Sequence, residues 1–123
     1  VARAADLMTR AHAEAVRDLL ALASLDPAAI DLIGFHGQTV FHDPASKFTW
    51  QIGDGALLAR LTSIDVVSDF RTNDVKAGGQ GAPLIPLYHA ALAHVLEKPV
   101  AILNIGGVAN VTYIDEEQVM AFD

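Results

Sequence analysis

The stretch from Val100 to Asp123 constrains the fold most, because it carries three short strand patterns in close succession. The first pattern, Val100–Ile105, is apolar and partly β-branched, and it stops at a pair of glycines. Val108–Ile114 resumes with Val, Thr and Tyr, and Gln118–Phe122 follows a polar turn. Two strand patterns joined by a glycine tip are typical of a β-hairpin. The stretch therefore predicts a three-stranded antiparallel meander.

The glycine tip of this hairpin, Gly106 and Gly107, is also a candidate anion site. Glycine has no Cβ, so backbone N–H groups can approach a phosphate closely, and concave arrangements of N–H groups favour anions. Asn104 and Asn110 flank the tip and could add side-chain donors and acceptors. An ordinary hairpin turn explains the same residues, and the local pattern leaves both interpretations open.

The rest of the chain alternates between helix and strand patterns. Apolar residues recur at spacings of three or four in a run of good helix formers, which predicts an amphipathic helix over Ala2–Leu25. Further strands are predicted at Ile30–Phe35, Phe48–Ile52 and Ile64–Ser68, and further helices at Ala56–Thr62 and Leu84–Leu96, the last broken early by Pro86. This alternation indicates an α/β fold with a mixed sheet and flanking helices.

Polar clusters follow two of the predicted strands. His36–Thr39 comes after the first strand, and residues 69–74 follow a later one. Ligands of α/β sheets bind beyond the carboxyl ends of strands, so both clusters stand where a site is expected. Arg71 offers planar donors suited to a carboxylate or phosphate. The alternatives are a loop that only turns the chain and a surface ion pair of Arg71 with Asp69 or Asp74, worth ~0–1 kcal/mol.

Composition excludes several classes of protein. The 123 residues carry 8 Lys plus Arg against 15 Asp plus Glu, a net charge of −7, so no basic field is available for nucleic acid. No apolar run approaches the ~20 residues that span a bilayer, and no signal-peptide pattern opens the chain, so the cytoplasm is the default location. The absence of cysteine excludes disulfides and thiolate metal sites. Neither standard nucleotide fingerprint is present. The residues alone thus indicate a phosphate- or sugar-binding α/β protein.

A series of short motifs carries a more specific signal. FHGQT, QIGDGALLA, DFRTND, GGQGAPL, LNIGGVANVT and AFD occur in this order. The series resembles the 1,6-anhydro-N-acetylmuramic acid kinase family of the actin, hexokinase and heat-shock chaperone superfamily. The resemblance implies a ribonuclease H-like core in each of two domains. Residues 1–98 would then form the latter part of the N-terminal domain, and residues 99–123 the phosphate-binding hairpin that opens the C-terminal domain.

The resemblance also implies a reaction. Water opens the 1,6-anhydro bridge at the anomeric carbon while ATP phosphorylates the oxygen released at position 6, which gives N-acetylmuramic acid 6-phosphate for peptidoglycan recycling. Asp123 matches the family's catalytic aspartate, the base that activates the water. A carboxylate at a strand end beside phosphate-binding backbone suits this role.

The remaining site residues are carried over from the same motifs. The residues expected on the sugar side are His36, Gln38, Thr39, Arg71 and Asp74, with Arg71 facing the lactyl carboxylate. The residues expected near the nucleotide phosphates are Asn104, Gly106 and Gly107, with Mg²⁺ screening the charge. The implied cofactors are ATP and Mg²⁺, with no metal site made by the protein alone. The partners are the amino sugar and ATP, and a homodimer is left open.

Two departures from the family pattern matter. The GTSLDG-type phosphate motif and the GPGN-type loop are both missing, so we expect a piece of a longer protein that is inactive alone. The competing interpretations are a nucleotide-dependent binding module of the chaperone or actin kind and a catalytically dead subunit. The motifs HGQT and DFRTND favour the kinase, because such a module has no reason to carry them.

Overall fold

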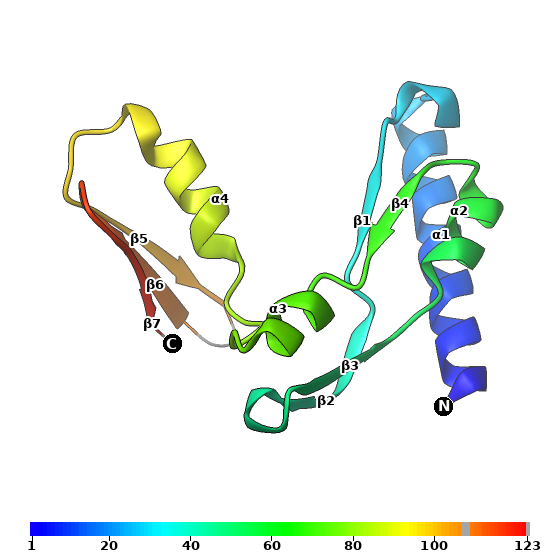
Figure 1. Ribbon diagram of the computed structural model, residues 1–123. Helices are drawn as coiled ribbons and strands as arrows, with labels where there is room; N and C mark the ends of the chain where they lie inside the picture. Colours follow the sequence, from blue (N-terminus) through cyan, green and yellow to red (C-terminus); the bar gives the residue numbers. More distant parts are fainter. Residues whose placement is uncertain (107–108, 123) are drawn as a thin grey trace. The chain divides into compact units, whose positions relative to one another are not determined.

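The computed structural model describes residues 1–106 and 109–122 and has a mixed α/β fold with small sheets (Figure 1). The chain forms two compact units, Val1–Gly81 and Ala82–Asp123, which are described separately. Helix α4 (Ile85–Leu92) belongs to the second unit, because it packs against strands there.

The first unit contains three helices and four strands among its described residues. In chain order they are α1 (Ala2–Ala23), β1 (Ile33–Phe35), β2 (Gln38–Asp43), β3 (Phe48–Ile52), α2 (Gly55–Thr62), β4 (Val66–Ser68) and α3 (Thr72–Ala77), with short 3₁₀ turns at Pro27–Ala29 and Pro44–Ser46. The predicted helices at α1 and α2 and the strands at β1, β3 and β4 are present, with some shorter bounds. Strand β2 and helix α3 occupy segments that the sequence analysis treated as polar loops.

Strand pairing in the first unit decides which loops meet. Strand β1 pairs with β4 in parallel, with Phe35 opposite Ser68. The carboxyl ends of these two strands therefore lie at the same edge. Strands β2 and β3 form a separate antiparallel hairpin, with Thr39 opposite Gln51 and a register irregularity just after Thr39. Parallel and antiparallel pairing thus occur in separate small sheets.

The core of the first unit lies between α1, α2 and β1. Ala13, Phe35 and Leu58 are almost fully buried and pack together. Helices α1 and α2 contact each other and lie side by side in Figure 1. Asp54 caps α2, because its carboxylate accepts a hydrogen bond from the Leu57 N–H at 2.8 Å. The hydroxyl of Thr9 on α1 accepts from the Asp54 N–H at 3.0 Å, which ties the two helices together.

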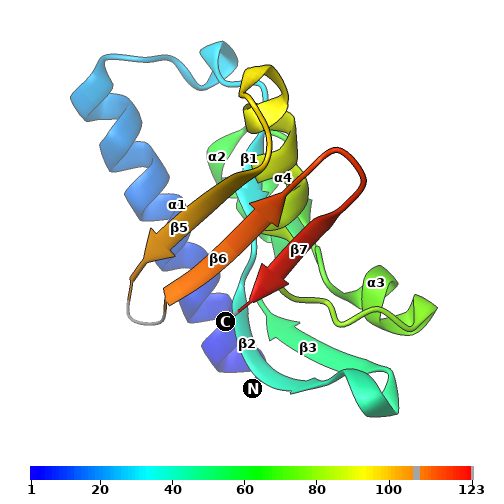
Figure 2. The same cartoon turned by 90° about the vertical axis from the view of Figure 1, so that its left-hand side faces the viewer.

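The second unit confirms the predicted meander. Strands β5 (Val100–Ile105), β6 (Ala109–Ile114) and β7 (Val119–Phe122) are antiparallel in the order β5-β6-β7 (Figure 2). Helix α4 and a 3₁₀ turn (Ala93–Val95) precede them, and Pro86 lies in the first turn of α4. The expected break at Pro86 is therefore wrong. Backbone N–H groups in the first turn of a helix have no acceptor within the helix, so a proline there costs no hydrogen bond. His89 Nδ1 lies 2.8 Å from Thr112 Oγ1 on β6.

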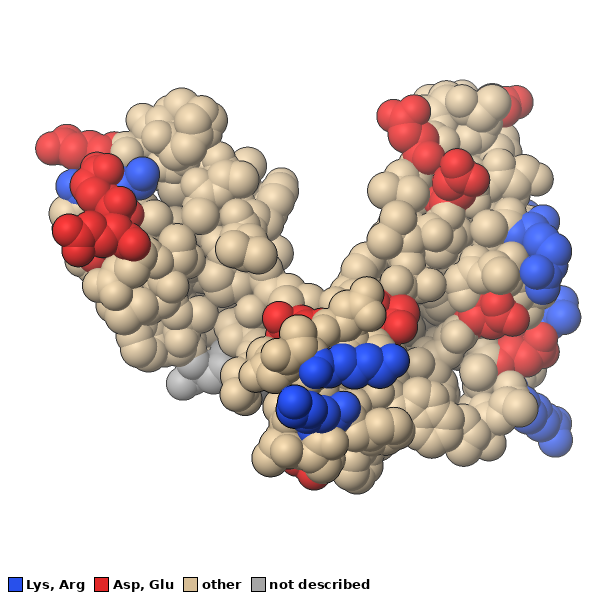
Figure 3. Space-filling model, in the orientation of Figure 1, with Lys and Arg blue, Asp and Glu red and all other residues tan. Residues whose placement is uncertain are grey.

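The surface carries no large basic region on the face drawn in Figure 3. Lys and Arg atoms appear there in small separate groups, with Asp and Glu groups between them and a wide uncharged area. Among the residues that the structure describes, none of the helices combines the length and apolar character that a membrane crossing requires.

The turn between β6 and β7 is organised by Asp115. Its carboxylate accepts hydrogen bonds from the N–H groups of Glu117 and Gln118 at 2.8 and 2.9 Å. These bonds stabilise the charged form, the Glu117 bond most, and they hold the pKa of Asp115 below its usual range. The ionised carboxylate of Asp115 therefore stabilises the folded turn.

A pH-dependent loss of this turn is expected at acid pH. Because the folded pKa of Asp115 is lowered, its contribution is complete above the unfolded Asp pKa of about 3.9 and is lost as the pH falls through the folded pKa. Amide hydrogen-exchange protection factors of Glu117 and Gln118 should fall over that range in the wild type and stay flat in Asp115→Asn. Glu116→Gln is the control, and pH-independent protection in the wild type would contradict the prediction.

Candidate active site

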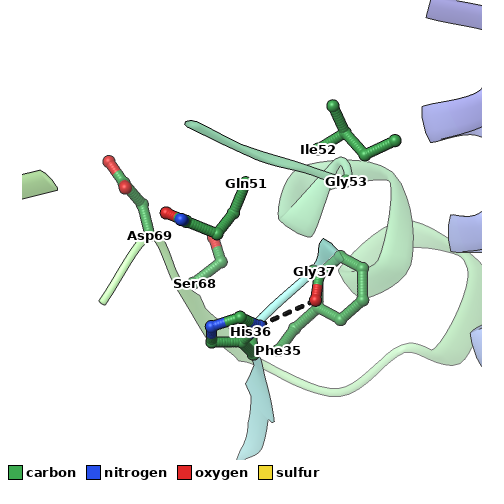
Figure 4. Close-up of a pocket in the computed structure, with 8 residues that line it drawn as sticks. All are labelled: Phe35, His36, Gly37, Gln51, Ile52, Gly53, Ser68 and Asp69. Atoms are coloured by element: carbon green, nitrogen blue, oxygen red, sulfur yellow. Dashed lines mark hydrogen bonds between the residues drawn. The ribbon is translucent and has the colours of Figure 1, made fainter. Parts of the chain in front are cut away.

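The paired ends of β1 and β4 form a small polar pocket together with the end of β3 (Figure 4). Its volume is about 70 Å³, and it is lined by Phe35, His36, Gly37, Gln51, Ile52, Gly53, Ser68 and Asp69. Whole-ligand clefts usually measure roughly 300–1,000 Å³. The pocket therefore has room for one substituent of a ligand rather than for a complete sugar.

His36 and Arg71, which are far apart in sequence, meet beside this pocket. Arg71 Nε donates a hydrogen bond to His36 Nε2 at 2.8 Å. Because an arginine only donates, Nε2 of His36 must be the acceptor, so the ring proton is on Nδ1. That nitrogen lies 2.8 Å from the Gly37 carbonyl oxygen and donates to it. Both ring nitrogens are thus engaged, and the network fixes the orientation of the His36 ring.

The loop after α3 is held by Arg71 and Asp74 together. Arg71 Nη1 donates to the Gly81 carbonyl, and the Gly81 N–H donates to Asp74 Oδ2 at 2.6 Å. A Cβ at Gly79 would overlap the Asp74 carboxylate, so a larger residue there would displace this carboxylate from its contact with the Gly81 N–H. Residues predicted for the site from separate motifs, His36, Arg71 and Asp74, therefore belong to one hydrogen-bonded network.

The surface ion-pair interpretation of Arg71 does not hold. Within residues 1–106 and 109–122 the structure shows one ion pair, between Asp6 and Arg10 on α1 at 3.0 Å. Arg71 is half-buried and directs its donors to an imidazole and a backbone carbonyl. Asp69, the other candidate partner, instead accepts a hydrogen bond from the Thr72 hydroxyl. Arg71 thus fixes the geometry of two loops.

Gln38 and Thr39 were expected in a polar loop, but they lie in a strand. They are the first residues of β2, and neither lines the pocket. The exposed Gln38 side chain donates to the Thr39 carbonyl at 3.3 Å. The Thr39 hydroxyl accepts a hydrogen bond from Gln51 Nε2 at 3.1 Å, so Thr39 stands behind a residue that does line the pocket.

Two polar pocket residues, Gln51 and Ser68, were not singled out from the sequence, whereas Asp69 belongs to the predicted polar cluster at residues 69–74. Gln51 lies within the QIGDG motif, but its position opposite Thr39 follows from strand register. Asp69 adopts a left-handed backbone conformation with φ of 58°, which is uncommon outside glycine and often marks functional loops. Gly37, with φ of 70°, brings its backbone against the Ile52 carbonyl, where a Cβ would lie at 2.4 Å.

The candidate phosphate hairpin belongs to the second unit. Asn104 and Asn110 are direct partners across β5 and β6, next to the tip of the hairpin. Gly106 is exposed at the end of β5. Gly107 and Asp123 lie outside the described residues. Within the described part of the hairpin, Asn104 and Asn110 therefore lie opposite each other in register, and Gly106 directly follows β5.

Comparison with known proteins identifies the family. The family model for anhydro-N-acetylmuramic acid kinase matches residues 1–123. The anhydro-N-acetylmuramic acid kinase of Paramagnetospirillum magneticum is 60% identical over 113 residues, which cover 91% of this chain and 32% of the relative. The protein of that name from Methylobacterium nodulans is 59% identical over 123 residues, covering 98% of this chain and 33% of the relative.

A further relative shows the same coverage. The anhydro-N-acetylmuramic acid kinase of Rhizorhabdus wittichii is 54% identical over 125 residues, which cover 100% of this chain and 34% of the relative. The chain thus spans about a third of the length of these curated relatives. Because the family model matches this chain from residue 1 to residue 123, the chain belongs to the anhydro-N-acetylmuramic acid kinase family.

Proposed function

We propose that the whole protein is an ATP-dependent kinase that opens 1,6-anhydro-N-acetylmuramic acid and phosphorylates it, as part of peptidoglycan recycling. The observation that carries the proposal is the family match over residues 1–123. The network of His36, Arg71 and Asp74 supports it, because residues from separate family motifs cooperate in one structure.

The proposed reaction consumes one water and one ATP. The water oxygen bonds to the anomeric carbon, and the bond between that carbon and the bridging oxygen breaks. The released oxygen at position 6 takes the γ-phosphoryl group, and ADP leaves. Asp123, by its match to the family motif, takes the proton of the water. The products are N-acetylmuramic acid 6-phosphate and ADP.

His36, Gln38, Thr39, Arg71 and Asp74 are proposed for the sugar side of the site. Arg71 can present its outer nitrogen to the lactyl carboxylate while Nε and Nη1 hold His36 and Gly81. Thr39 acts through Gln51 in this proposal, because its hydroxyl holds that amide. Asn104, Gly106 and Gly107 are proposed to contact the phosphates of ATP.

Mg²⁺ is proposed to accompany ATP. Within the part of the chain that the structure describes, no group of three or more His, Asp or Glu side chains could enclose a metal ion. These residues therefore do not form a protein cage for Mg²⁺, and we assign none of them to it. Such a cage is unnecessary in kinases, where substrate phosphate oxygens, water and one or two carboxylates bind Mg²⁺, and the ion neutralises charge on the transferred group.

The fold and location follow from the same family. We propose that the α/β elements belong to a ribonuclease H-like, two-domain kinase. Residues 1–98 would form the latter part of its N-terminal domain, and residues 99–123 the first meander of its C-terminal domain. We further propose that the protein acts in the cytoplasm and that its ligands are small molecules. The net charge of −7 supports the second point, because it disfavours binding to nucleic acid.

The test is an assay of the whole protein with ATP, Mg²⁺ and the anhydro-sugar. Mass spectrometry should show a product heavier than the sugar by one water and one phosphoryl group, formed only when ATP is present. N-acetylglucosamine, which has no anhydro bridge, is the control substrate. ATP hydrolysis without a change in the sugar, together with no heat of sugar binding beside a non-hydrolysable ATP analogue, would favour a nucleotide-dependent binding module instead.

A further inference from the structure

The amide of Gln51 is anchored at its nitrogen end. Gln51 Nε2 donates hydrogen bonds to Thr39 Oγ1 at 3.1 Å and to Thr49 Oγ1 at 2.8 Å. Thr49 is only 8% exposed, and its hydroxyl lies 2.8 Å from His42 Nδ1. The carboxamide is therefore held by a chain of side chains on β2 and β3, which orients its oxygen.

The oxygen end of the same amide has no comparable anchor. Gln51 Oε1 is buried, and within residues 1–106 and 109–122 it has no hydrogen-bond partner. A buried acceptor without a donor is unfavourable, so such atoms are rare, and each one points to strain, a bound water or ion, or a functional contact. Gln51 lines the pocket at the ends of β1 and β4, where its side chain reaches toward Asp69 and Ser68 (Figure 4).

The chemistry of the pocket specifies the group that would satisfy this atom. Gln51 Oε1 and the Asp69 carboxylate only accept hydrogen bonds, and the Ser68 hydroxyl can also accept. The entering group must therefore carry an O–H or N–H donor. A volume of about 70 Å³ admits a hydroxyl, a hydroxymethyl or one acetamide, each of which is a typical substituent of an amino sugar.

We propose that Gln51 is a specificity-determining residue of the sugar site. Its Oε1 accepts a hydrogen bond from an O–H or N–H of the amino sugar, while Thr39 and Thr49 position the amide. This inference rests on the proposed function. A single bound water is the alternative occupant of a pocket of this size, and the experiment separates the two.

The test compares variants of the whole protein. Gln51→Leu keeps the approximate shape and removes the acceptor, and it should raise the KM and Kd for the sugar about tenfold or more. The affinity for a non-hydrolysable ATP analogue should not change. Gln51→Glu keeps acceptor oxygens, to which the two threonine hydroxyls can donate, and should recover most of the sugar affinity. Gln118→Leu, in the β6–β7 turn, is the matched control.

Sugar analogues identify the group that enters the pocket. In a series where each analogue lacks one O–H or N–H, one analogue should bind the wild type more weakly by about the same factor as the Gln51→Leu change. This analogue and the full sugar should bind the Gln51→Leu variant equally well, because that variant has already lost the contact. If Gln51→Leu fails to fold by circular dichroism, the same comparison is made with Gln51→Met, which also lacks the acceptor oxygen.

The outcomes distinguish the two proposals. Wild-type protein that does not phosphorylate the anhydro-sugar overturns the proposed function and the inference with it. If the wild type is active, two results overturn only the inference. One is an unchanged KM for the sugar in Gln51→Leu, and the other is that no analogue binds that variant as well as the full sugar does after binding the wild type more weakly. The pocket would then hold water.

Discussion

Replacing Asp123 by asparagine in the whole protein is expected to lower the turnover number by about 10²- to 10⁴-fold, the usual contribution of a general base. Asparagine has nearly the same shape as aspartate but cannot take a proton from the attacking water. Sugar binding should persist, because the amide still fills the position. The measurements are ADP release for turnover and calorimetric titration with the sugar beside a non-hydrolysable ATP analogue.

Asp115→Asn is the matched control for this substitution. It removes a carboxylate from the β6–β7 turn, where Asp115 holds backbone N–H groups rather than substrate. Turnover should therefore be close to that of the wild type. Unchanged turnover in Asp123→Asn would eliminate Asp123 as the base. Loss of sugar binding together with turnover would indicate a binding or structural role instead.

Replacing Arg71 by lysine is expected to weaken both the fold and sugar binding. Lysine keeps the positive charge but lacks the planar set of donors that reaches His36 Nε2 and the Gly81 carbonyl at once. Loss of one of these charged hydrogen bonds from a half-buried site should cost about 1–3 kcal/mol of unfolding free energy. The KM for the sugar should rise about ten- to a hundredfold, because the ring of His36 and the Gly81 loop lose their fixed positions.

Urea unfolding and steady-state kinetics measure the two effects of Arg71→Lys. Arg60→Lys, on the exposed side of α2, is the control and should change neither. A double-mutant cycle with His36→Ala adds a sharper criterion, because residues in one network are not additive. Additive effects of Arg71→Lys and His36→Ala on the KM would contradict the proposed network, as would an unchanged KM in Arg71→Lys.

Local patterns predicted much of the secondary structure because the signals lie within a few residues. The three- and four-residue spacing of apolar positions in α1, the run of helix formers in α2 and the strands on either side of Gly106 needed no distant partner. The strand β2 was not predicted, because the pairing of Thr39 with Gln51 stabilises residues that resemble a polar loop when considered alone.

The candidate site divides along the same line. By itself the sequence determined which motifs carry chemistry and therefore the family, since a series of residue types in order is a property of the chain alone. Only the tertiary structure decided that Arg71 holds His36 and that Gln51 lines the pocket with an amide oxygen that has no partner among the described residues. Those contacts depend on the parallel pairing of β1 with β4 and on the register of β2 with β3, and long-range backbone pairing leaves no local trace in the residues it brings together.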